Sequence, residues 1–164
     1  MKVKILKNED WKQFRILRLE ALKEHPEAFG SSFEEEVNLS DEEFEINFKK
    51  STFFGVLENN NLVACAGFFT FLLSKMKHKG VVFSMYTKRD YRNLRIADAL
   101  LKSVITHAKK LVIQLHLTVV TSNHVALKLY QNNGFRVYGT EHRALKIGEQ
   151  FHDEHLMVLD LDKD

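Results

Sequence analysis

The sequence predicts an α/β or α+β fold, in which helices cover a β-sheet. Segments with helical spacing of apolar residues alternate with segments rich in β-branched and aromatic residues, as such folds require. The length of 164 residues suits one hydrophobic core, and the composition, 45% hydrophobic and 28% charged, is close to the globular average. We therefore expect a single folded domain over residues 1–164.

Two helices are expected before the first predicted strand. The first spans residues 9–23, because Asn8 can cap its start and Pro26 prevents much continuation. The second begins after Ser40, since Ser40 and Glu43 have the spacing of a capping box, in which each residue satisfies the other's free backbone N–H. The apolar faces consist of Trp11, Phe14, Leu17, Leu19 and Leu22 in the first helix and of Phe44 and Phe48 in the second.

Strands are predicted where β-branched and aromatic residues cluster. Residues 52–58 and 62–70 flank the turn-prone Asn59–Asn61, so we expect them to form a β-hairpin. The segment 111–120 is apolar almost throughout, which is typical of a strand covered on both faces. Three further strands are expected at residues 81–87, 135–143 and 153–161.

Two more helices are predicted between these strands. One carries a continuous apolar stripe on a single face. The other spans residues 123–132 and ends at Asn133–Gly134, since a glycine in the left-handed conformation commonly terminates a helix. The stripe of the first helix consists of Ala97, Leu100, Leu101, Val104, Ile105 and Ala108.

Composition and charge argue against several classes of protein. The net charge of +2 disfavours a nucleic-acid-binding protein, and the basic segment has no aromatic residues arranged for base stacking. The longest apolar run, Leu62–Leu73, is shorter than the ~20 residues of a membrane helix. The N-terminus lacks the apolar core of a signal peptide, and the single cysteine, Cys65, allows no intrachain disulfide. We therefore expect a cytoplasmic protein with neither a membrane nor a nucleic-acid partner.

Two segments are strongly charged. Residues 31–48 contain seven acidic residues and no Lys or Arg, which would suit a cationic ligand. Residues 75–110 contain ten basic residues against two acidic ones, and within them Tyr86–Ala97 runs from a predicted strand end into a helix start. The free backbone N–H groups of a helix start can bind phosphate, here aided by Arg92 and Arg95. On position alone, an ordinary solvated surface is the more common explanation for each segment.

Two motifs resemble the GNAT superfamily of N-acetyltransferases. The run Arg92–Ala97 (RNLRIA) resembles the pyrophosphate-binding motif Arg/Gln-x-x-Gly-x-Gly/Ala, with Arg95 in place of the first glycine. Residues 123–135 (NHVALKLYQNNGF) match the pattern N-x-x-A-x-x-L-Y-x-x-x-G-F. The resemblance extends to Arg18–Glu34 and to the last two predicted strands, and it points to a bacterial, single-domain branch of the superfamily.

The resemblance implies a fold and a coenzyme site. The fold is a mixed, strongly bent sheet of six to seven strands flanked by about four helices, and coenzyme A enters where the fourth and fifth strands splay apart. Acetyl-CoA is then the co-substrate, no metal takes part, and a primary amine of a small molecule or protein N-terminus attacks directly, without an acyl-enzyme. The residues so assigned to the coenzyme are Met85, Tyr86, Thr87, Arg92, Asn93, Leu94, Arg95, Ile96, Ala97, Asn123 and Tyr130.

The resemblance also implies catalytic roles. Tyr130 would protonate the departing thiolate, and a backbone N–H within Met85–Thr87 would polarise the thioester carbonyl. Glu20 or Glu35 would accept a proton from the acceptor. The acidic residues 31–48 would border the acceptor cleft, so the expected partner is a cationic amine.

Other interpretations stay open. The domain could bind coenzyme A without turnover, as a sensor or interaction module, and the oligomeric state, including a homodimer, is undetermined. His152 and His155 would face opposite sides of a strand, which argues against a metal site. Cys65 lies in an apolar predicted strand and is expected to be a small buried hydrophobe.

Overall fold

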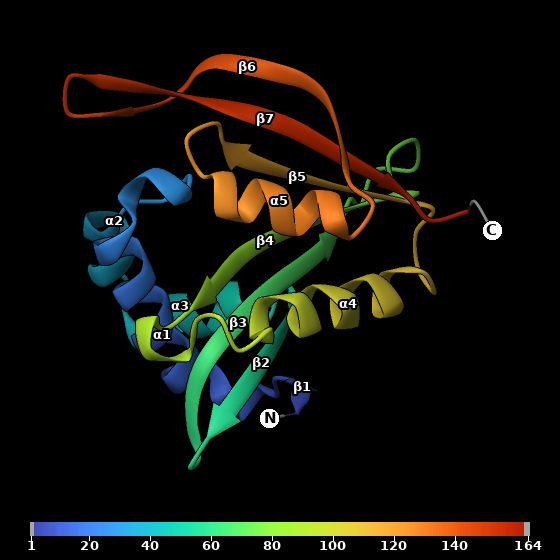
Figure 1. Cartoon of the computed structure of the whole chain (residues 1–164). Helices are drawn as coiled ribbons and strands as arrows, with labels where there is room; N and C mark the ends of the chain where they lie inside the picture. The colour runs from blue at the N-terminus through green and yellow to red at the C-terminus, as the bar shows by residue number, and fades with distance from the viewer. Residues whose placement is uncertain (1, 163–164) are drawn as a thin grey trace.

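The computed structural model describes residues 2–162, which form a seven-stranded sheet with five α-helices on its two faces (Figure 1). This confirms the mixed, helix-flanked sheet, with one α-helix more than expected. The helices are α1 (Trp11–Glu24), α2 (Phe33–Val37), α3 (Asp41–Phe48), α4 (Ile96–Ala108) and α5 (His124–Asn132), with 3₁₀ helices η1 (Asn8–Asp10), η2 (Pro26–Ala28) and η3 (Arg89–Tyr91). The strands are β1 (Val3–Ile5), β2 (Thr52–Glu58), β3 (Asn61–Thr70), β4 (Lys79–Thr87), β5 (Gln114–Val120), β6 (Arg136–Ile147) and β7 (Gln150–Asp160).

The sheet contains a splay between β4 and β5. The strand order is β1-β2-β3-β4-β5-β7-β6, and every neighbouring pair is antiparallel except β4 and β5, which are parallel. These two strands pair only between Lys79–Val81 and Gln114–His116. Beyond that point they separate, and Figure 1 shows them diverging towards their carboxyl ends. The splay implied by the family resemblance is therefore present.

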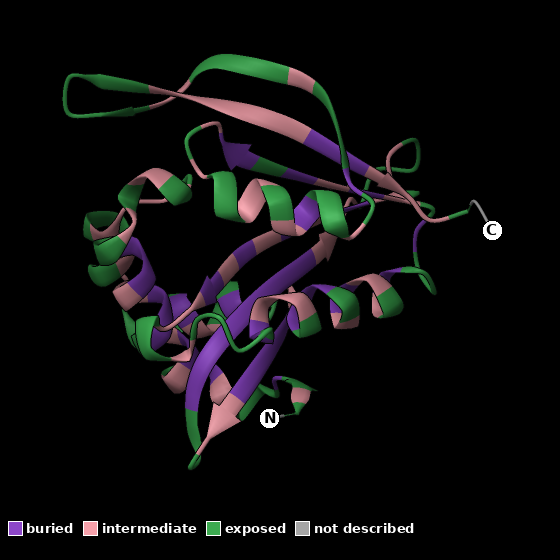
Figure 2. Cartoon of the chain, in the orientation of Figure 1, coloured by how far each residue is buried: buried purple, intermediate pink, exposed green. Residues whose placement is uncertain are grey.

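Each face of the sheet has its own hydrophobic core, visible as the buried segments of the central strands in Figure 2. On the α1 and α3 face, the Phe14 ring centroid lies 6.2, 5.2 and 4.2 Å from those of Phe44, Phe48 and Phe53. α4 and α5 pack on the opposite face, one on each side of the splay. The predicted stripe of α4 is confirmed in its completely buried members, Leu100, Leu101, Val104 and Ala108.

The first helix begins later than the sequence suggested. Residues 8–10 form η1, and α1 starts at Trp11. Asn8 is not the helix cap; instead Asp10 Oδ2 accepts a hydrogen bond from Lys7 N at 2.7 Å. The only local signal for the helix start is a polar residue just before the amphipathic run, and Asn8 and Asp10 both provide this signal.

Two short elements were missed. β1 is a three-residue edge strand, too short to show a period of two. α2 has only five residues, and its acidic sequence was interpreted as a charged surface. It nevertheless begins with a capping box, Ser32 with Glu35, of the same kind as the predicted box of Ser40 with Glu43, which the structure confirms.

The last three strands differ from their predicted bounds. β5 begins at Gln114 rather than at residue 111, because Leu111 and Ile113, with 56% and 51% exposure, belong to the turn after α4. β6 and β7 are longer than expected and form an extended arm that turns at Gly148. By contrast, β2 has the predicted bounds.

Gly134 ends α5 as predicted, in the left-handed region with φ of 90°. An added Cβ would lie 3.2 Å from Leu159 Cδ1. Gly134→Ala is therefore expected to lower the free energy of unfolding by about 1–2 kcal/mol, measured by urea denaturation. Gly30 is the matched control, because an added Cβ there meets no atom within 4 Å. Gly30→Ala should change stability by less than about 0.5 kcal/mol, and equal effects of the two variants would contradict the expectation.

Candidate active site

β4 presents an unpaired edge to the splay. From Val82 to Thr87 its β5-facing side has no strand partner among residues 2–162, so backbone N–H and C=O groups remain to be satisfied by another molecule. An extended ligand can pair with such an edge as an added strand would. The sequence-predicted residues Met85, Tyr86 and Thr87 all lie on this segment.

A bulge distorts β4 beside the splay. The register between β3 and β4 shifts between Cys65 and Gly67, so that Ser84 and Met85 together lie opposite a single residue of β3. Ser84 has φ of 53°, and its carbonyl accepts a hydrogen bond from the Cys65 thiol at 3.3 Å. A trans peptide directs its C=O and N–H to opposite sides. Since Cys65 packs in the core under α1, the Met85 N–H is directed to the other face, where α4 and α5 lie.

The loop after β4 leads to an open helix start. Ala99 N makes the first intrahelical hydrogen bond of α4, to Arg95 O at 3.1 Å, and no side chain within residues 2–162 caps the N–H groups of Ile96–Asp98. Arg95, at the first-glycine position of the motif, has φ of 57°, and Asn93 has φ of 64°. The turn thus keeps the left-handed geometry that glycine would adopt without strain. The side chains of residues 92–95 are exposed, whereas Ile96 is buried.

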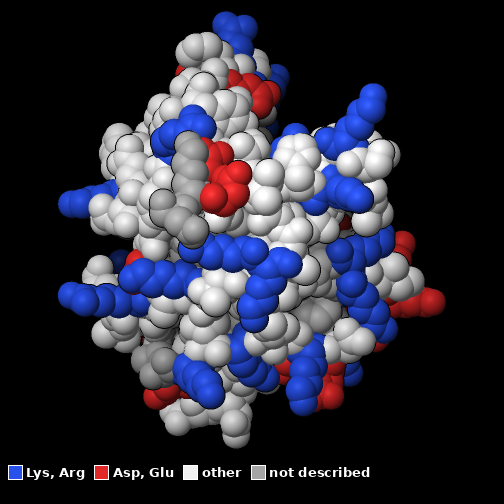
Figure 3. Space-filling view, turned by 90° about the vertical axis from the view of Figure 1, so that its right-hand side faces the viewer, with Lys and Arg blue, Asp and Glu red and all other residues white. Residues whose placement is uncertain are grey.

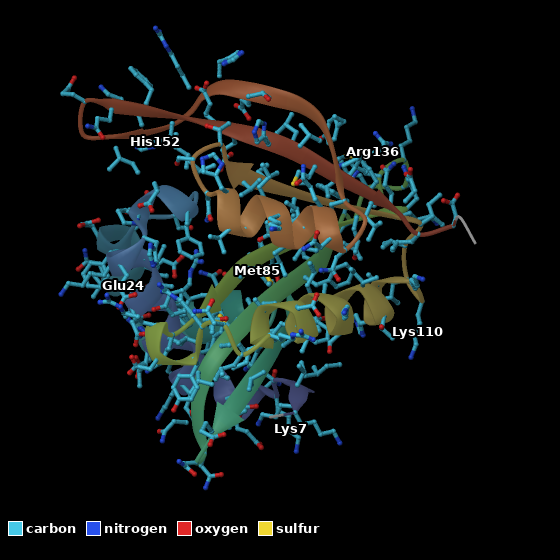
Figure 4. All side chains as sticks on the ribbon, viewed as in Figure 1. Lys7, Glu24, Met85, Lys110, Arg136 and His152 are labelled. Atoms are coloured by element: carbon cyan, nitrogen blue, oxygen red, sulfur yellow. The ribbon has the colours of Figure 1, made fainter. Side chains whose placement is uncertain are left out.

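Arg92 connects this loop to the end of α1. Its Nε donates to Thr87 O at 3.0 Å, and its Nη2 lies 3.1 Å from His25 Nε2 and 3.5 Å from Glu24 Oε2. In Figure 4, Glu24 marks the α1 side of this group and Met85 marks β4. To contact a phosphate, the guanidinium would exchange its partners on α1 for the anion.

Tyr86 joins β4 to two carboxylates of α1. Its hydroxyl lies 2.9 Å from both Glu20 Oε1 and Glu24 Oε2, and Lys88 Nζ lies 3.1 Å from Glu20 Oε2. Burial, followed by the hydrogen bonds to the two carboxylates, raises the pKa of Tyr86 well above its ordinary value. The phenol therefore stays a donor, and Glu20 is held between a hydroxyl and an ammonium. Glu24 and Lys88 were not identified from the sequence.

Tyr130 combines a buried ring with an unpaired hydroxyl. The residue is 7% exposed, and its ring centroid lies 6.0 Å from that of Phe135. The hydroxyl makes no hydrogen bond within residues 2–162, yet it is not sealed from solvent. Burial raises the pKa of Tyr130 to about 12, so the hydroxyl keeps its proton near neutral pH.

Asn123 caps α5 rather than lying within it. Its Oδ1 accepts a hydrogen bond from Ala126 N at 3.1 Å, and its φ of −86° and ψ of 72° are not helical. The helix predicted for residues 123–132 therefore begins one residue later, at His124. Asn123 lies at the helix start, and Tyr130 lies in the last turns.

Glu35 is part of the α2 cap. Its Oε2 accepts hydrogen bonds from Ser32 N at 2.9 Å and from Ser32 Oγ at 3.0 Å. The Ser32 backbone N–H and, next, the Ser32 hydroxyl lower the pKa of Glu35. Both effects make this exposed carboxylate a poorer proton acceptor.

Glu154 is a carboxylate that the sequence analysis did not identify. It pairs on β7 with Val120 at the end of β5. Met157, three residues along the strand, packs under α5, so Glu154 projects from the opposite face. Burial raises the pKa of Glu154; a hydrogen bond with Thr118 opposes this shift, and the charge of Glu141 adds to it. Only the pairing of β5 with β7 brings Glu154 next to the splay, and a sequence does not reveal that pairing.

The acidic segment forms α2 and α3, beside α1. Three of its carboxylates are ion-paired: Asp41 lies 2.7 Å from Arg15 Nη1, Glu36 lies 2.8 Å from Arg18 Nη2, and Glu45 lies 2.7 Å from Lys49 Nζ. Glu35 and Glu43 accept hydrogen bonds within their helix caps, which leaves the side chains of Glu34 and Glu42 without a partner among residues 2–162.

The basic segment does not form one patch. The loop with Arg92 and Arg95 follows the carboxyl end of β4, whereas residues 75–79 lie at its amino end. At that end His78 O accepts from Ile113 N at 3.0 Å, which places residues 75–79 near the end of α4. Figure 3 shows Lys and Arg side chains gathered on this side, where Lys110 is labelled in Figure 4. Only the first group of cations lies beside the splay.

No group of three or more His, Cys, Asp or Glu side chains within residues 2–162 is arranged to hold a metal ion. No helix in the same range is long and apolar enough to cross a bilayer. Two surface hollows of about 360 and 430 Å³, one between β2 and α4 and one at the ends of β2 and β3, contain none of the predicted site residues.

Comparison with solved structures shows the same fold in bacterial acetyltransferases. A GNAT-family acetyltransferase from Streptococcus pneumoniae superposes with a TM-score of 0.84 at 23% identity, covering 97% of this chain and 98% of that one. An N-acetyltransferase from Staphylococcus aureus Mu50 gives 0.80 at 22% identity, with 98% of each chain covered. A putative acetyltransferase from Salmonella typhimurium, solved with its cofactor acetyl-CoA, gives 0.82 at 14% identity, covering 100% and 95%.

No curated protein matches the chain. The family described as "Acetyltransferase (GNAT) family" matches residues 12–135, a span that includes the splay, the open helix start and Tyr130. Because this match covers well over half of the sequence, the chain belongs to the GNAT acetyltransferase family.

Proposed function

We propose that this protein is an acetyl-CoA-dependent N-acetyltransferase acting on a primary amine of a small molecule or a protein N-terminus. The observation that carries the proposal is the unpaired edge of β4, and it is supported by the open start of α4, which follows that strand, and by the unpaired hydroxyl of Tyr130 on α5, the helix on the other side of the splay. Family membership supports acetyl transfer, and the Salmonella protein of the same fold was solved with acetyl-CoA.

The chain's own groups fit coenzyme A along the splay. The N–H groups of Ile96–Asp98 would hold the pyrophosphate, with Arg92 and Arg95 as neighbouring cations. Residues 93 and 94 would line the same turn. The backbone of Met85–Thr87 would pair with the extended pantetheine arm, and α5, from Asn123 to Tyr130, would lie along its other side.

The chemistry proposed is direct attack by a neutral amine. The amine nitrogen bonds to the acetyl carbon and releases one proton to solvent, the carbon–sulfur bond breaks, and the thiolate takes the proton of Tyr130. The Met85 N–H, directed to the α4 and α5 face, would donate to the carbonyl oxygen as negative charge develops there. The Tyr130 hydroxyl can regain a proton because it is not completely sealed from solvent.

Glu154 is the favoured acceptor of the proton that an ammonium must lose. Its raised pKa makes it a better base than an ordinary carboxylate, and it lies one strand from the splay. Glu20 is occupied by Tyr86 and Lys88, and Glu35 by its helix cap, so both are weaker candidates. The carboxylates Glu154 and Glu141, with the acidic α2 and α3, favour a cationic acceptor.

Arg92→Ala should weaken acetyl-CoA binding at least about tenfold in calorimetric titration, because a charge-assisted contact with phosphate is lost. The control is Arg89→Ala, an exposed arginine of the same loop, which should bind like the wild type. Absence of binding by the wild-type protein would contradict the coenzyme assignment. Binding without transfer to any amine would instead make the protein a coenzyme-binding module.

Tyr130→Phe should lower kcat by about 100-fold or more while acetyl-CoA binding stays unchanged, because only the proton donor is removed. Tyr130 can act as the proton donor only while its hydroxyl is protonated. Because its pKa is about 12, deprotonation of Tyr130 should not lower kcat until the pH approaches 12. Tyr138→Phe, at an exposed tyrosine of β6, is the control for a lost hydroxyl. A Tyr130→Phe enzyme with wild-type kcat would exclude this role.

Glu154→Gln should lower kcat and remove the rise of rate with pH that follows deprotonation of this carboxyl. Since the pKa of Glu154 lies above its ordinary value, that rise should occur at higher pH than for an exposed glutamate. Glu20→Gln and Glu35→Gln should keep it. A pH profile that loses its acidic limb in either of those variants, and not in Glu154→Gln, would assign the base elsewhere.

A further inference from the structure

A buried cation links α1, α2 and β4 on the face opposite α4 and α5. Arg18 is only 8% exposed. Its Nε and Nη2 form a fork on Glu36 of α2, with Nε 3.1 Å and Nη2 2.8 Å from Glu36 Oε1. Its Nη1 donates to Ser84 Oγ of β4 at 2.8 Å, in a buried hydrogen bond. The guanidinium carbon also lies 4.9 Å from the Phe29 ring centroid.

Ser84, which this cation reaches, is the left-handed residue of the β4 bulge. A non-glycine residue at φ of 53° within a strand is held there by its surroundings. Arg18 holds its side chain, and the Cys65 thiol holds its carbonyl at 3.3 Å. Burial raises the pKa of Cys65 to about 12, so the thiol keeps the proton that it donates. Two contacts from one face thus fix the peptide plane between Ser84 and Met85.

We propose that Arg18 is a positioning residue for acetyl transfer. Through Ser84 it fixes the peptide whose N–H, that of Met85, is directed to the coenzyme side of the splay. The inference rests on the proposed function, in which this N–H donates to the thioester carbonyl. Hydrogen bonds weaken steeply when misaligned, and an oxyanion donor contributes about 10²–10³ in kcat, so a rotated peptide would cost rate.

The contact with Ser84 is not needed merely to pack the helices. The two hydrogen bonds of Arg18 to Glu36 already connect α1 to α2, and the carboxylate charge of Glu36 compensates the buried guanidinium. The remaining guanidinium nitrogen, Nη1, bonds to β4 at Ser84, where β4 is no longer paired with β5. Arg18 thereby connects the ion pair between α1 and α2 to the peptide between Ser84 and Met85.

The test compares Ser84→Ala and Arg18→Met with Arg15→Met. Ser84→Ala removes only the hydroxyl that Arg18 holds, whereas Arg18→Met removes the whole bridge. Arg15, one turn earlier on α1, binds Asp41 at 2.7 Å and makes no hydrogen bond or ion pair with β4 within residues 2–162, so it is the matched control. The measurements are kcat and KM for acetyl-CoA with the best amine found, the unfolding midpoint, and the amide resonance of ¹⁵N-labelled Met85.

Ser84→Ala and Arg18→Met should each lower kcat at least about tenfold, with KM for acetyl-CoA changed less than about threefold. Both should shift the Met85 amide resonance, and the double variant should lose little more than the larger single effect. Arg15→Met should change neither kcat nor the resonance. If Arg18→Met does not fold, Ser84→Ala decides alone.

Wild-type kcat in folded Ser84→Ala protein would overturn the inference. A wild-type protein that transfers acetyl to no amine would defeat the proposed function instead. In that case the ligand-free Met85 amide resonance of the Arg18 variants decides, because Arg18 is distant from Met85 in the sequence: an unchanged resonance in Arg18→Met, or in Arg18→Lys if Arg18→Met does not fold, overturns the positioning role, and a shifted one upholds the link from Arg18 to Met85.

Discussion

The parting of β4 from β5 after three paired residues is the constraint on which the other features of the site depend. Backbone N–H and C=O groups within a sheet are normally satisfied by a neighbouring strand, and here one edge of β4 is left without one. The gap persists because each side is anchored elsewhere: β4 by β3, and β5 by its full-length pairing with β7. α4 and α5 cover the same face on either side of it.

α1 contacts β4 along the part of the strand that β5 no longer pairs with. Two polar groups connect them at the free end of the strand: Tyr86 with Glu20 and Glu24, and Ser84 with Arg18. Both lie on the face opposite α4 and α5, so they stiffen β4 from one side without filling the gap. A strand held in this way from one side can present its other side to a ligand at little cost of reorganisation.

Positive and negative charges are concentrated in different parts of the structure around the splay. Cations and open N–H groups lie at the loop before α4, where a pyrophosphate would bind, and carboxylates lie on α2, α3 and the end of β7, where a cationic amine would approach. Arg92 connects the two regions, since it contacts both the β4 loop and Glu24 of α1. A phosphate that attracts Arg92 would therefore also alter the charge around Glu24 and Tyr86.

The sequence by itself determined the elements whose signals are local. The capping box of Ser40, the left-handed stop at Gly134 and the apolar stripe of α4 each depend on residues a few positions apart, and all three are present. The motif at Arg92–Ala97 and the run 123–135 likewise predicted which segments surround the splay. β1 and α2 were missed because elements of three and five residues carry too little periodic signal.

Only the tertiary structure decided which side chains meet. Glu154 comes next to β5 through a pairing across more than thirty residues, and Arg18 reaches Ser84 across a separation of 66 residues. Neither contact has a local signature, because hydrogen bonds between distant segments depend on register and strand order rather than on neighbouring residues. The contact that engages Glu20, with Tyr86, likewise spans 66 residues and has no local signature. Glu35, by contrast, is engaged by Ser32 three residues away, in a local pattern that the sequence analysis missed.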